Sequence, residues 1–134
     1  MRNPQRGQSL IEFAFILPIF LLLMLGGADL IMAYSAKQNV NYVAEESARC
    51  LALAVGTPNP NCTNAQTYAQ TLASGVGLPT SSQNNLTASA SSACPNYAVT
   101  VTYQFTPVFP FFPASIPLSS TAQFTCTAPT PPSP

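Results

Sequence analysis

The longest apolar run of the chain, residues 10–33, lies close to its start, and only Glu12 and Asp29 carry a charge within it. About 20 apolar residues cross the hydrocarbon core of a bilayer as a helix, so this run predicts a transmembrane helix. Arg2 and Arg6 precede it, and basic flanks stay on the cytoplasmic side. We therefore expect a cytoplasmic N-terminus and a chain that continues outside. A cleaved secretory signal is one alternative, although its apolar core is typically about 7–15 residues long. An uncut signal anchor is another, and it leaves Glu12 unexplained.

A helical pattern continues beyond the apolar run and ends at Gly56. Small and apolar residues recur every three to four positions and predict one buried face, which comprises Val40, Val43, Ala44, Ser47, Cys50, Leu51 and Ala54. The opposite face is polar and carries Asn39, Asn41, Glu45 and Arg49. We expect one stalk helix from Gln8 to Ala54, about 70 Å long at 1.5 Å per residue. Residues 8–33 would lie in the membrane and residues 34–56 outside it. Two helices broken near Tyr34 are the alternative.

Alternation of period two predicts a strand over residues 97–105. One face of this strand would carry its large side chains, which are Tyr97, Val99, Val101, Tyr103 and Phe105. We expect weaker strands over residues 118–126 and 86–92. Because two strands alone are marginally stable, the sheet would need to pack against a helix. The pattern thus predicts an antiparallel sheet of two or three strands.

A short helix is expected over residues 65–74, with Thr63 or Asn64 as its N-cap. Together with the sheet it would form a small exodomain of residues 57–127. The proline-rich end, residues 128–134, would be an extended tail. The chain as a whole therefore predicts an α+β fold in which a long transmembrane and stalk helix precedes a small exodomain.

Three aromatic residues lie in a proline-rich turn between the two longer strands: Phe109, Phe111 and Phe112. Exposed, they would form an adhesive or subunit-binding patch. In a domain with few large apolar residues, we expect two of them to be buried at the end of the sheet and one to be exposed.

Asp29 stands near the outer end of the apolar run. We expect its carboxylate to be solvated at the membrane surface. Pairing with Lys37, two helical turns further on, or with a partner subunit is the alternative.

Charge is scarce and confined to one part of the chain. The four basic and four acidic residues all lie at or before Arg49, and the chain has no His. Without a basic patch, nucleic-acid binding is excluded, because such binding depends on neutralising phosphates. No residue pattern provides a base that would activate Ser or Cys as a nucleophile. The sequence thus predicts a protein that is not an enzyme and that holds no cofactor or metal.

The four cysteines, Cys50, Cys62, Cys94 and Cys126, are an even number in a small domain beyond a membrane span. This predicts two disulfides and an oxidising compartment; free or metal-bound thiols are the alternative. Antiparallel pairing of residues 97–105 with about 118–126 brings residue 94 opposite residue 126. We therefore expect a Cys94–Cys126 bond, which leaves Cys50–Cys62 to hold the end of the long helix to its loop.

The start of the chain, "RGQSLIEFAFILP", resembles a type IV prepilin signal. In that family a membrane peptidase cuts after the glycine, here Gly7. The resemblance implies a cytoplasmic leader of residues 1–7, a new N-terminus at Gln8, and a carboxylate, Glu12, at the fifth mature position. The longer string "GQSLIEFAFILPIFLLLMLGGADL" is similar to the TadE-like pseudopilins of the tight-adherence (Tad) pilus system. The residues that match their signature in order are Gly7, Glu12, Phe13, Ala14 and Pro18.

This resemblance implies a pilin-like structural subunit, a minor pseudopilin that assembles into or primes a Tad-type pilus. Glu12 would neutralise the terminal amine of a neighbouring subunit; the alternative is a headgroup-level carboxylate favoured by the helix dipole. Pro18 would kink or loosen the helix during extraction from lipid. The alternative is a tolerated kink without a function, since transmembrane helices often contain Pro. The implied partners are the prepilin peptidase, other pilin or pseudopilin subunits and lipid of the bacterial inner membrane. The exodomain would lie in the periplasm or on an extracellular pilus. The alternative is an uncut single-pass anchor whose neutral exodomain serves recognition or adhesion.

Overall fold

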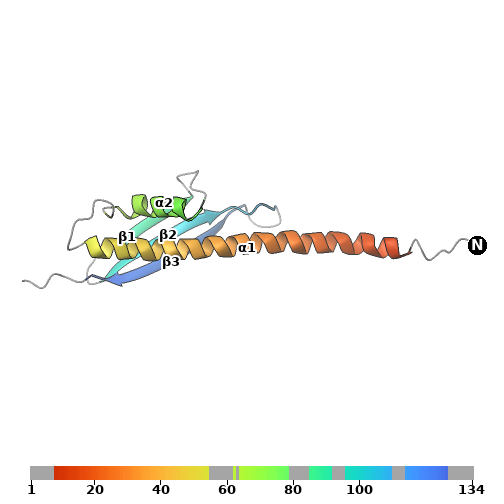
Figure 1. The fold of residues 1–134 in the computed structure, drawn as a ribbon, viewed down its shortest axis with the longest axis horizontal. Helices are drawn as coiled ribbons and strands as arrows, with labels where there is room; N and C mark the ends of the chain where they lie inside the picture. Colours follow the sequence, from red (N-terminus) through yellow and green to blue (C-terminus); the bar gives the residue numbers. More distant parts are fainter. Residues whose placement is uncertain are drawn as a thin grey trace, which may run out of the picture.

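The computed structural model describes residues 8–54, 62, 64–78, 85–91, 96–109 and 114–126, and the side chains of the first segment from Leu10 onward. The fold is α+β, as the sequence predicted: a long helix, a short helix and an antiparallel sheet (Figure 1). In chain order the elements are α1 (Gln8–Ala54), α2 (Ala65–Gly75), β1 (Leu86–Ser91), β2 (Asn96–Phe105) and β3 (Ile116–Thr125).

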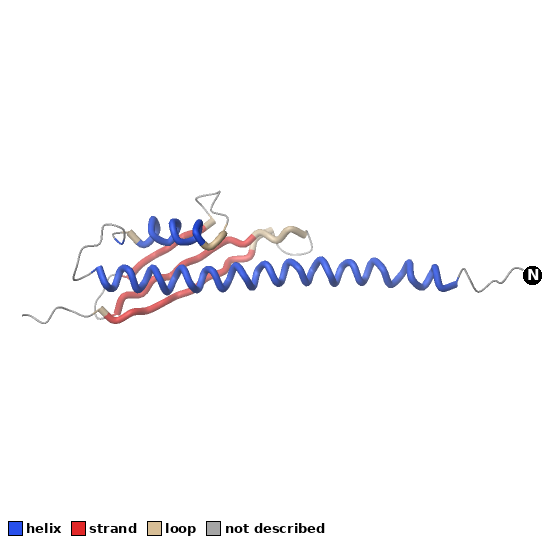
Figure 2. The backbone as a smooth tube through the Cα atoms, viewed as in Figure 1, coloured by secondary structure: helices blue, strands red, loops and turns tan. Residues whose placement is uncertain are grey.

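Helix α1 is a single rod of 47 residues, about 70 Å long at 1.5 Å per residue. It continues past Tyr34 without interruption, so the alternative of two helices is wrong. Figure 2 shows the sheet and α2 lying alongside the C-terminal half of α1, whereas no described element lies beside the N-terminal half. One helix therefore serves both as an exposed apolar rod, residues 10–25, which we call the shaft, and as the main support of the exodomain.

The predicted buried face of α1 is the one that packs against the exodomain. Its buried side chains recur every three to four residues: Ala36, Val40, Val43, Ala44, Ser47, Ala48, Leu51 and Ala52. Most of them are small, so the helix approaches the sheet closely. Across from them, Val99 and Val101 of β2 are fully buried. The core is thus a valine and alanine contact between one helix and the central strand.

The sheet has the order β1–β2–β3, and both strand pairs are antiparallel. Tyr97 pairs with Phe124 and Phe105 with Ile116, so the last strand begins two residues earlier than predicted. The register keeps large side chains on the face toward the helices and hydroxyl side chains on the other, where Thr100 and Thr121 share a hydrogen bond of 2.9 Å. The alternation in β2 therefore reports a sheet that is covered on one side.

Helix α2 packs on the core through three alanines on one face: Ala65, Ala69 and Ala73. Its N-cap is Asn64, one of the two predicted residues, whose side chain accepts a hydrogen bond from the Gln66 backbone N–H at 2.9 Å. The chain reverses at Gly77, whose φ of 76° is unfavourable for residues with a Cβ. The helix is therefore delimited by local signals at both ends.

Side chains from the two helices bind the outer edges of the sheet. The Gln66 amide donates to the Leu86 carbonyl at 2.8 Å and accepts from the Ala88 N–H at 2.5 Å. On the opposite edge, the Lys37 ammonium donates to the Ser119 carbonyl, and Pro117, which lacks an N–H, lies two residues before it. Exposed strand edges invite pairing with other chains, and these residues cover part of each edge.

A disulfide joins Cys50 of α1 to Cys62, with the Cα atoms 5.7 Å apart, which is the pairing predicted from the sequence. It holds the end of α1 near the start of α2. Cys126, which directly follows β3, is also disulfide-bonded. Cys94 lies outside the described residues, so its predicted bond to Cys126 stays a prediction.

Candidate membrane and assembly site

The N-terminal half of α1 presents apolar side chains in every direction. All residues from Leu10 to Leu25 are exposed, and an 18-residue stretch within α1 reaches a mean hydropathy of 2.4 with none of it buried in the protein. A helix that is apolar all round needs an apolar environment such as a bilayer or a bundle of similar helices. By length and composition, α1 can cross a membrane.

Glu12 places a charge on this apolar surface, in the second turn of α1. It is exposed on α1, four residues after Gln8, and no described residue forms a hydrogen bond or an ion pair with it. A carboxylate at the centre of a bilayer costs about 2.5–3.5 kcal/mol on insertion scales, whereas the positive end of a helix dipole favours it. Its geometry leaves the carboxylate available to a group from outside the chain. Gly7, which together with Gln8 forms the predicted processing site, lies outside the described residues.

Pro18 lies inside α1, and the helix continues through it. Since proline lacks an N–H, it removes one hydrogen bond to the carbonyl of Ala14. Less than one turn before Asp29 lie Gly26 and Gly27, and apart from the backbone of α1 itself no described atom is within 4 Å of the place where their Cβ would lie. This part of α1 therefore has room for close contact with another helix.

Among the described side chains of α1, from Leu10 onward, Asp29 is the first that is buried, with 2% of its surface exposed. Its carboxylate accepts hydrogen bonds from the backbone N–H groups of Val108, at 3.2 Å, and Phe109, at 3.1 Å. The expected solvated carboxylate is therefore wrong, and so is the alternative partner Lys37, which binds the edge of β3 instead. The physical reason is the loop after β2, which folds back on α1 with its N–H groups directed at this carboxylate. Sequence patterns do not report such partners, because every non-proline residue has a backbone N–H.

The proline-rich loop after β2 is thus a contact of α1. Phe109, the first of its three aromatic residues, is half-buried, and Val108 is 67% exposed. Phe111 and Phe112 lie outside the described residues, so the expected burial of two aromatics and exposure of one stays a prediction.

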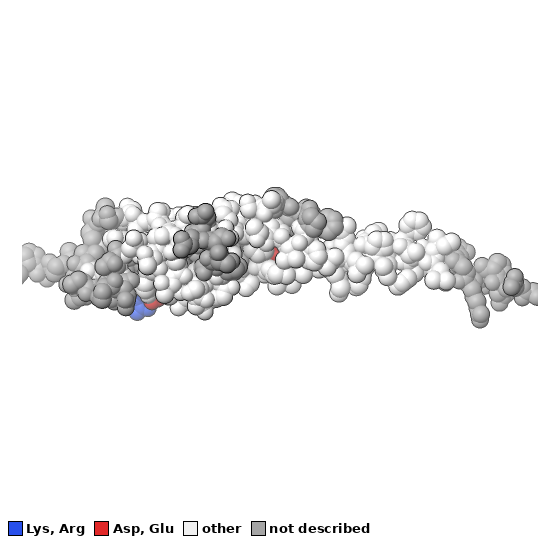
Figure 3. All heavy atoms as spheres, turned by 90° about the horizontal axis from the view of Figure 1, so that it is seen from above, with Lys and Arg blue, Asp and Glu red and all other residues white. Residues whose placement is uncertain are grey.

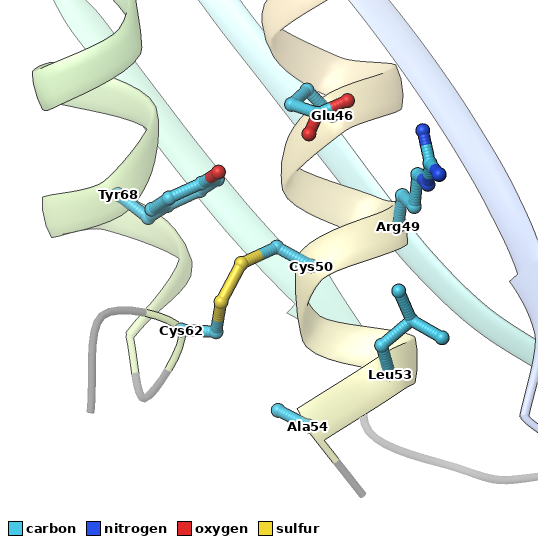
Figure 4. A pocket seen from close by; sticks show the side chains of 7 residues that line it. All are labelled: Glu46, Arg49, Cys50, Leu53, Ala54, Cys62 and Tyr68. Atoms are coloured by element: carbon cyan, nitrogen blue, oxygen red, sulfur yellow. A yellow bond between two sulfur atoms is a disulfide. The ribbon is translucent and has the colours of Figure 1, made fainter. Parts of the chain in front are cut away.

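A second polar site lies at the other end of the exodomain, beside the disulfide (Figure 4). It is a hollow of about 370 Å³ lined by Glu46, Arg49, Cys50, Leu53, Ala54, Cys62 and Tyr68. Burial raises the pKa of Tyr68, and the carboxylate of Glu46 raises it further. Both sulfurs in the hollow are in the disulfide, so neither is a thiolate nucleophile. We find no nucleophile with an adjacent base among the residues that line it.

Charged side chains are few on the surface that the structure describes. On the face drawn in Figure 3, almost all described atoms belong to uncharged residues. Within the described residues, no group of three or more His, Cys, Asp or Glu side chains could hold a metal ion. Contacts of this surface with other molecules will therefore depend on shape, apolar area and hydrogen bonds rather than on steering by charge.

Comparison with known proteins agrees with the geometry of α1. A family model described as "TadE-like protein" matches residues 7–49, which begin at the predicted processing glycine and end within the packed half of α1. Neither the curated proteins nor the solved structures that were compared gave a match. The match indicates a pilus-associated subunit, and the long apolar helix is compatible with a membrane anchor. Over residues 7–49, this chain is similar to the TadE-like proteins.

Proposed function

We propose that the chain is a structural subunit, a minor pseudopilin, that is cut between Gly7 and Gln8 and then assembles into or primes a Tad-type pilus. The observation that carries this proposal is the division of α1 into two halves. Its first half exposes apolar residues on all sides, and its second half is the core of a small exodomain. Such a helix can exchange lipid for the helices of neighbouring subunits without unfolding the exodomain.

In this proposal Glu12 is the assembly contact. Cleavage after Gly7 creates an ammonium on Gln8, close to the carboxylate in sequence and at the same end of α1. When subunits pack side by side, the ammonium of one can meet the Glu12 of the next. A completed buried ion pair roughly breaks even, whereas a buried charge without its partner costs about 3–5 kcal/mol. The pairing would therefore select the correct axial stagger between neighbouring subunits.

Cleavage is tested by expressing the chain with a prepilin peptidase and determining the N-terminus of the membrane-extracted protein. We expect it to begin at Gln8 and to hold 127 of the 134 residues (134 − 7). Gly7→Val is the control, because a branched side chain at the cut position should block processing. A chain that still begins at Met1 beside an active peptidase would instead support an uncut anchor with a recognition or adhesion exodomain.

The assembly contact is tested with Glu12→Gln in cells that carry the complete pilus machinery. We expect normal trimming but a strong loss of incorporation into sheared filaments. Glu45→Gln is the matched control, since Glu45 is an exposed carboxylate on the same helix. If Glu12→Gln subunits enter filaments as readily as Glu45→Gln subunits, Glu12 does not have this role.

The position of the subunit in the pilus separates a minor from a main subunit. Immunogold labelling of purified filaments with antibody to the exodomain should mark the tip or base. The exodomain is large compared with the very short main pilins that the resemblance implies. Uniform labelling along the length of the filament would indicate a main subunit.

A further inference from the structure

We propose that an apolar collar around α1 inserts into the outer interface of the membrane and seats the exodomain on the lipid. The collar comprises Leu30, Ile31 and Met32 of α1 together with Pro107 and Val108 of the loop after β2. Asp29 holds the loop in place. The proposal rests on the membrane-anchoring part of the proposed function, but not on cleavage or polymerisation.

The length of the helix places the collar at this level. From Leu10 to Asp29 the helix advances by 29 − 10 = 19 residues, which is about 28 Å. The hydrocarbon core of a bilayer is about 30 Å thick. If the apolar shaft begins to cross at Leu10, Asp29 lies where the helix leaves the hydrocarbon, and the next turn lies in the interface.

Exposure in the collar argues that something apolar covers it. Leu30 is 62% exposed, Ile31 72%, Met32 44% and Val108 67%. These residues surround the point where the loop meets the helix. Leu30 and Pro107 border a small hollow on one side, and Ile31, Met32 and Val108 border a hollow of about 470 Å³ on the other. The apolar surface of the shaft thus continues onto the exodomain without a break.

Tyr34 is a second indication that this level of α1 lies at the membrane interface. It lies one turn beyond Leu30, and the residue is 67% exposed. Its hydroxyl accepts a hydrogen bond from the Gln38 amide at 2.8 Å, one turn further from the shaft. Tyrosine is enriched at membrane interfaces because it has an apolar ring and a polar tip. Here the polar tip is bound by Gln38, on the exodomain side of Tyr34 along the helix.

Asp29 explains how a polar loop backbone can lie so close to lipid. Unpaired N–H groups are costly in an apolar environment, and the carboxylate binds those of Val108 and Phe109. These hydrogen bonds in turn satisfy the buried carboxylate. Asp29 is therefore a positioning residue that fixes the loop to α1 and turns Val108 outward.

Tryptophan fluorescence tests the collar directly, because the chain contains no Trp. The full chain, carrying one Trp at a time, is reconstituted into vesicles of phosphatidylethanolamine and phosphatidylglycerol that include lipids brominated near the headgroup. We expect Val108→Trp to emit at short wavelength and to be quenched by the shallow bromines. Leu53→Trp, at an exposed site near the far end of α1, should emit as in water and remain unquenched. Leu21→Trp, within the shaft, should be quenched by bromines placed deep in the acyl chain.

The variants give separate outcomes for the anchor and for the collar. If Leu21→Trp is not quenched, the membrane anchor fails and the collar with it. If Leu21→Trp is quenched and Val108→Trp emits as in water, the collar alone is wrong. If Val108→Trp becomes shielded only as the protein-to-lipid ratio rises, a second copy covers the collar, and the lipid proposal is overturned.

The role of Asp29 is tested in the Val108→Trp background. Asp29→Ala removes both acceptor oxygens, so the Trp emission should shift toward that of the water-exposed site and lose most of its quenching. Asp29→Asn keeps one acceptor and should give an intermediate result. Resistance of the exodomain to proteolysis equal to that of the Val108→Trp parent confirms that the exodomain is folded. Unchanged quenching in Asp29→Ala would overturn the positioning role.

Discussion

The bond between Gln66 and the edge of β1 offers the sharpest test of how the exodomain is held together. The two ends of its amide bind two backbone groups on the outer edge of the strand, the Leu86 carbonyl and the Ala88 N–H. The side chain therefore takes the place of a neighbouring strand. Gln66→Ala removes both hydrogen bonds and opens this edge of the sheet to water.

The expected loss in free energy of unfolding follows from the two hydrogen bonds that are removed. A typical intramolecular hydrogen bond contributes about 0.5–1.5 kcal/mol net, so the variant should lose about 2 kcal/mol in free energy of unfolding. Gln70→Ala is the matched control. Gln70 lies one turn further along α2, is half-buried like Gln66, and forms no side-chain hydrogen bond within the described residues. Both variants change helix propensity equally, so their difference isolates the bonds to β1.

The assay is thermal unfolding of the full chain in detergent, followed by near-ultraviolet circular dichroism of the tyrosines. For a domain of this size, 1 kcal/mol corresponds to about 4–8 °C in Tm. Gln66→Ala should therefore unfold about 8–16 °C below the wild type, and Gln70→Ala close to it. Gln66→Glu keeps the acceptor for the Ala88 N–H but repels the Leu86 carbonyl, so its Tm should lie between them. Equal shifts for Gln66→Ala and Gln70→Ala would refute the reasoning.

Three further predictions concern the core and the disulfide. Replacing both Cys50 and Cys62 by Ser should cost about 3 kcal/mol by the loop-entropy estimate for a sequence separation of 12; an unchanged guanidinium midpoint would contradict it. Burial raises the pKa of Tyr103 above its ordinary value of 10.0, so its contribution to stability is complete below pH 10.0 and is lost as the pH rises through the folded pKa. Tyr103→Phe should flatten that alkaline decline in a series of melts, and equal slopes would count against it. Ser47 is fully buried, and its hydroxyl has no partner among the described residues, so Ser47→Ala should leave stability unchanged or raise it by up to about 1 kcal/mol. The opposite type of substitution at the neighbouring buried position, Ala48→Ser, should lower the free energy of unfolding by about 1–3 kcal/mol. Denaturation curves of the two variants check that the changes have opposite signs.

The features that the sequence predicted correctly are those with a local period. The alternation from Tyr97 to Phe105 reports a sheet covered on one side, and the three-to-four spacing from Val40 to Leu51 reports a helix face against it. Both patterns arise because burial selects side chains at the spacing of the backbone geometry. The N-cap Asn64 is predictable for a similar reason, since its partner is two residues away.

What the sequence did not reveal are contacts between a side chain and a distant backbone. Asp29 binds N–H groups 79 and 80 residues away, and Gln66 binds β1 across 20 and 22 residues. A backbone N–H has no residue-type signature, so neither partner was predictable. The start of β3 was misplaced for a related reason. Its edge position and short side chains give weak alternation, and Ile116 and Pro117 were assigned to the preceding turn.

The shared use of α1 couples its apolar N-terminal half to the exodomain. Val40 and Val43 are fully buried against the sheet, so the exodomain cannot rotate about the helix without breaking its own core. Because each helical residue turns by about 100°, the side of α1 on which Glu12 projects is fixed relative to the sheet. Any force that draws the shaft out of lipid therefore moves the exodomain with it in a defined orientation. If subunits assemble through Glu12 as proposed, this rigid connection would determine which face of the exodomain meets the neighbouring subunit.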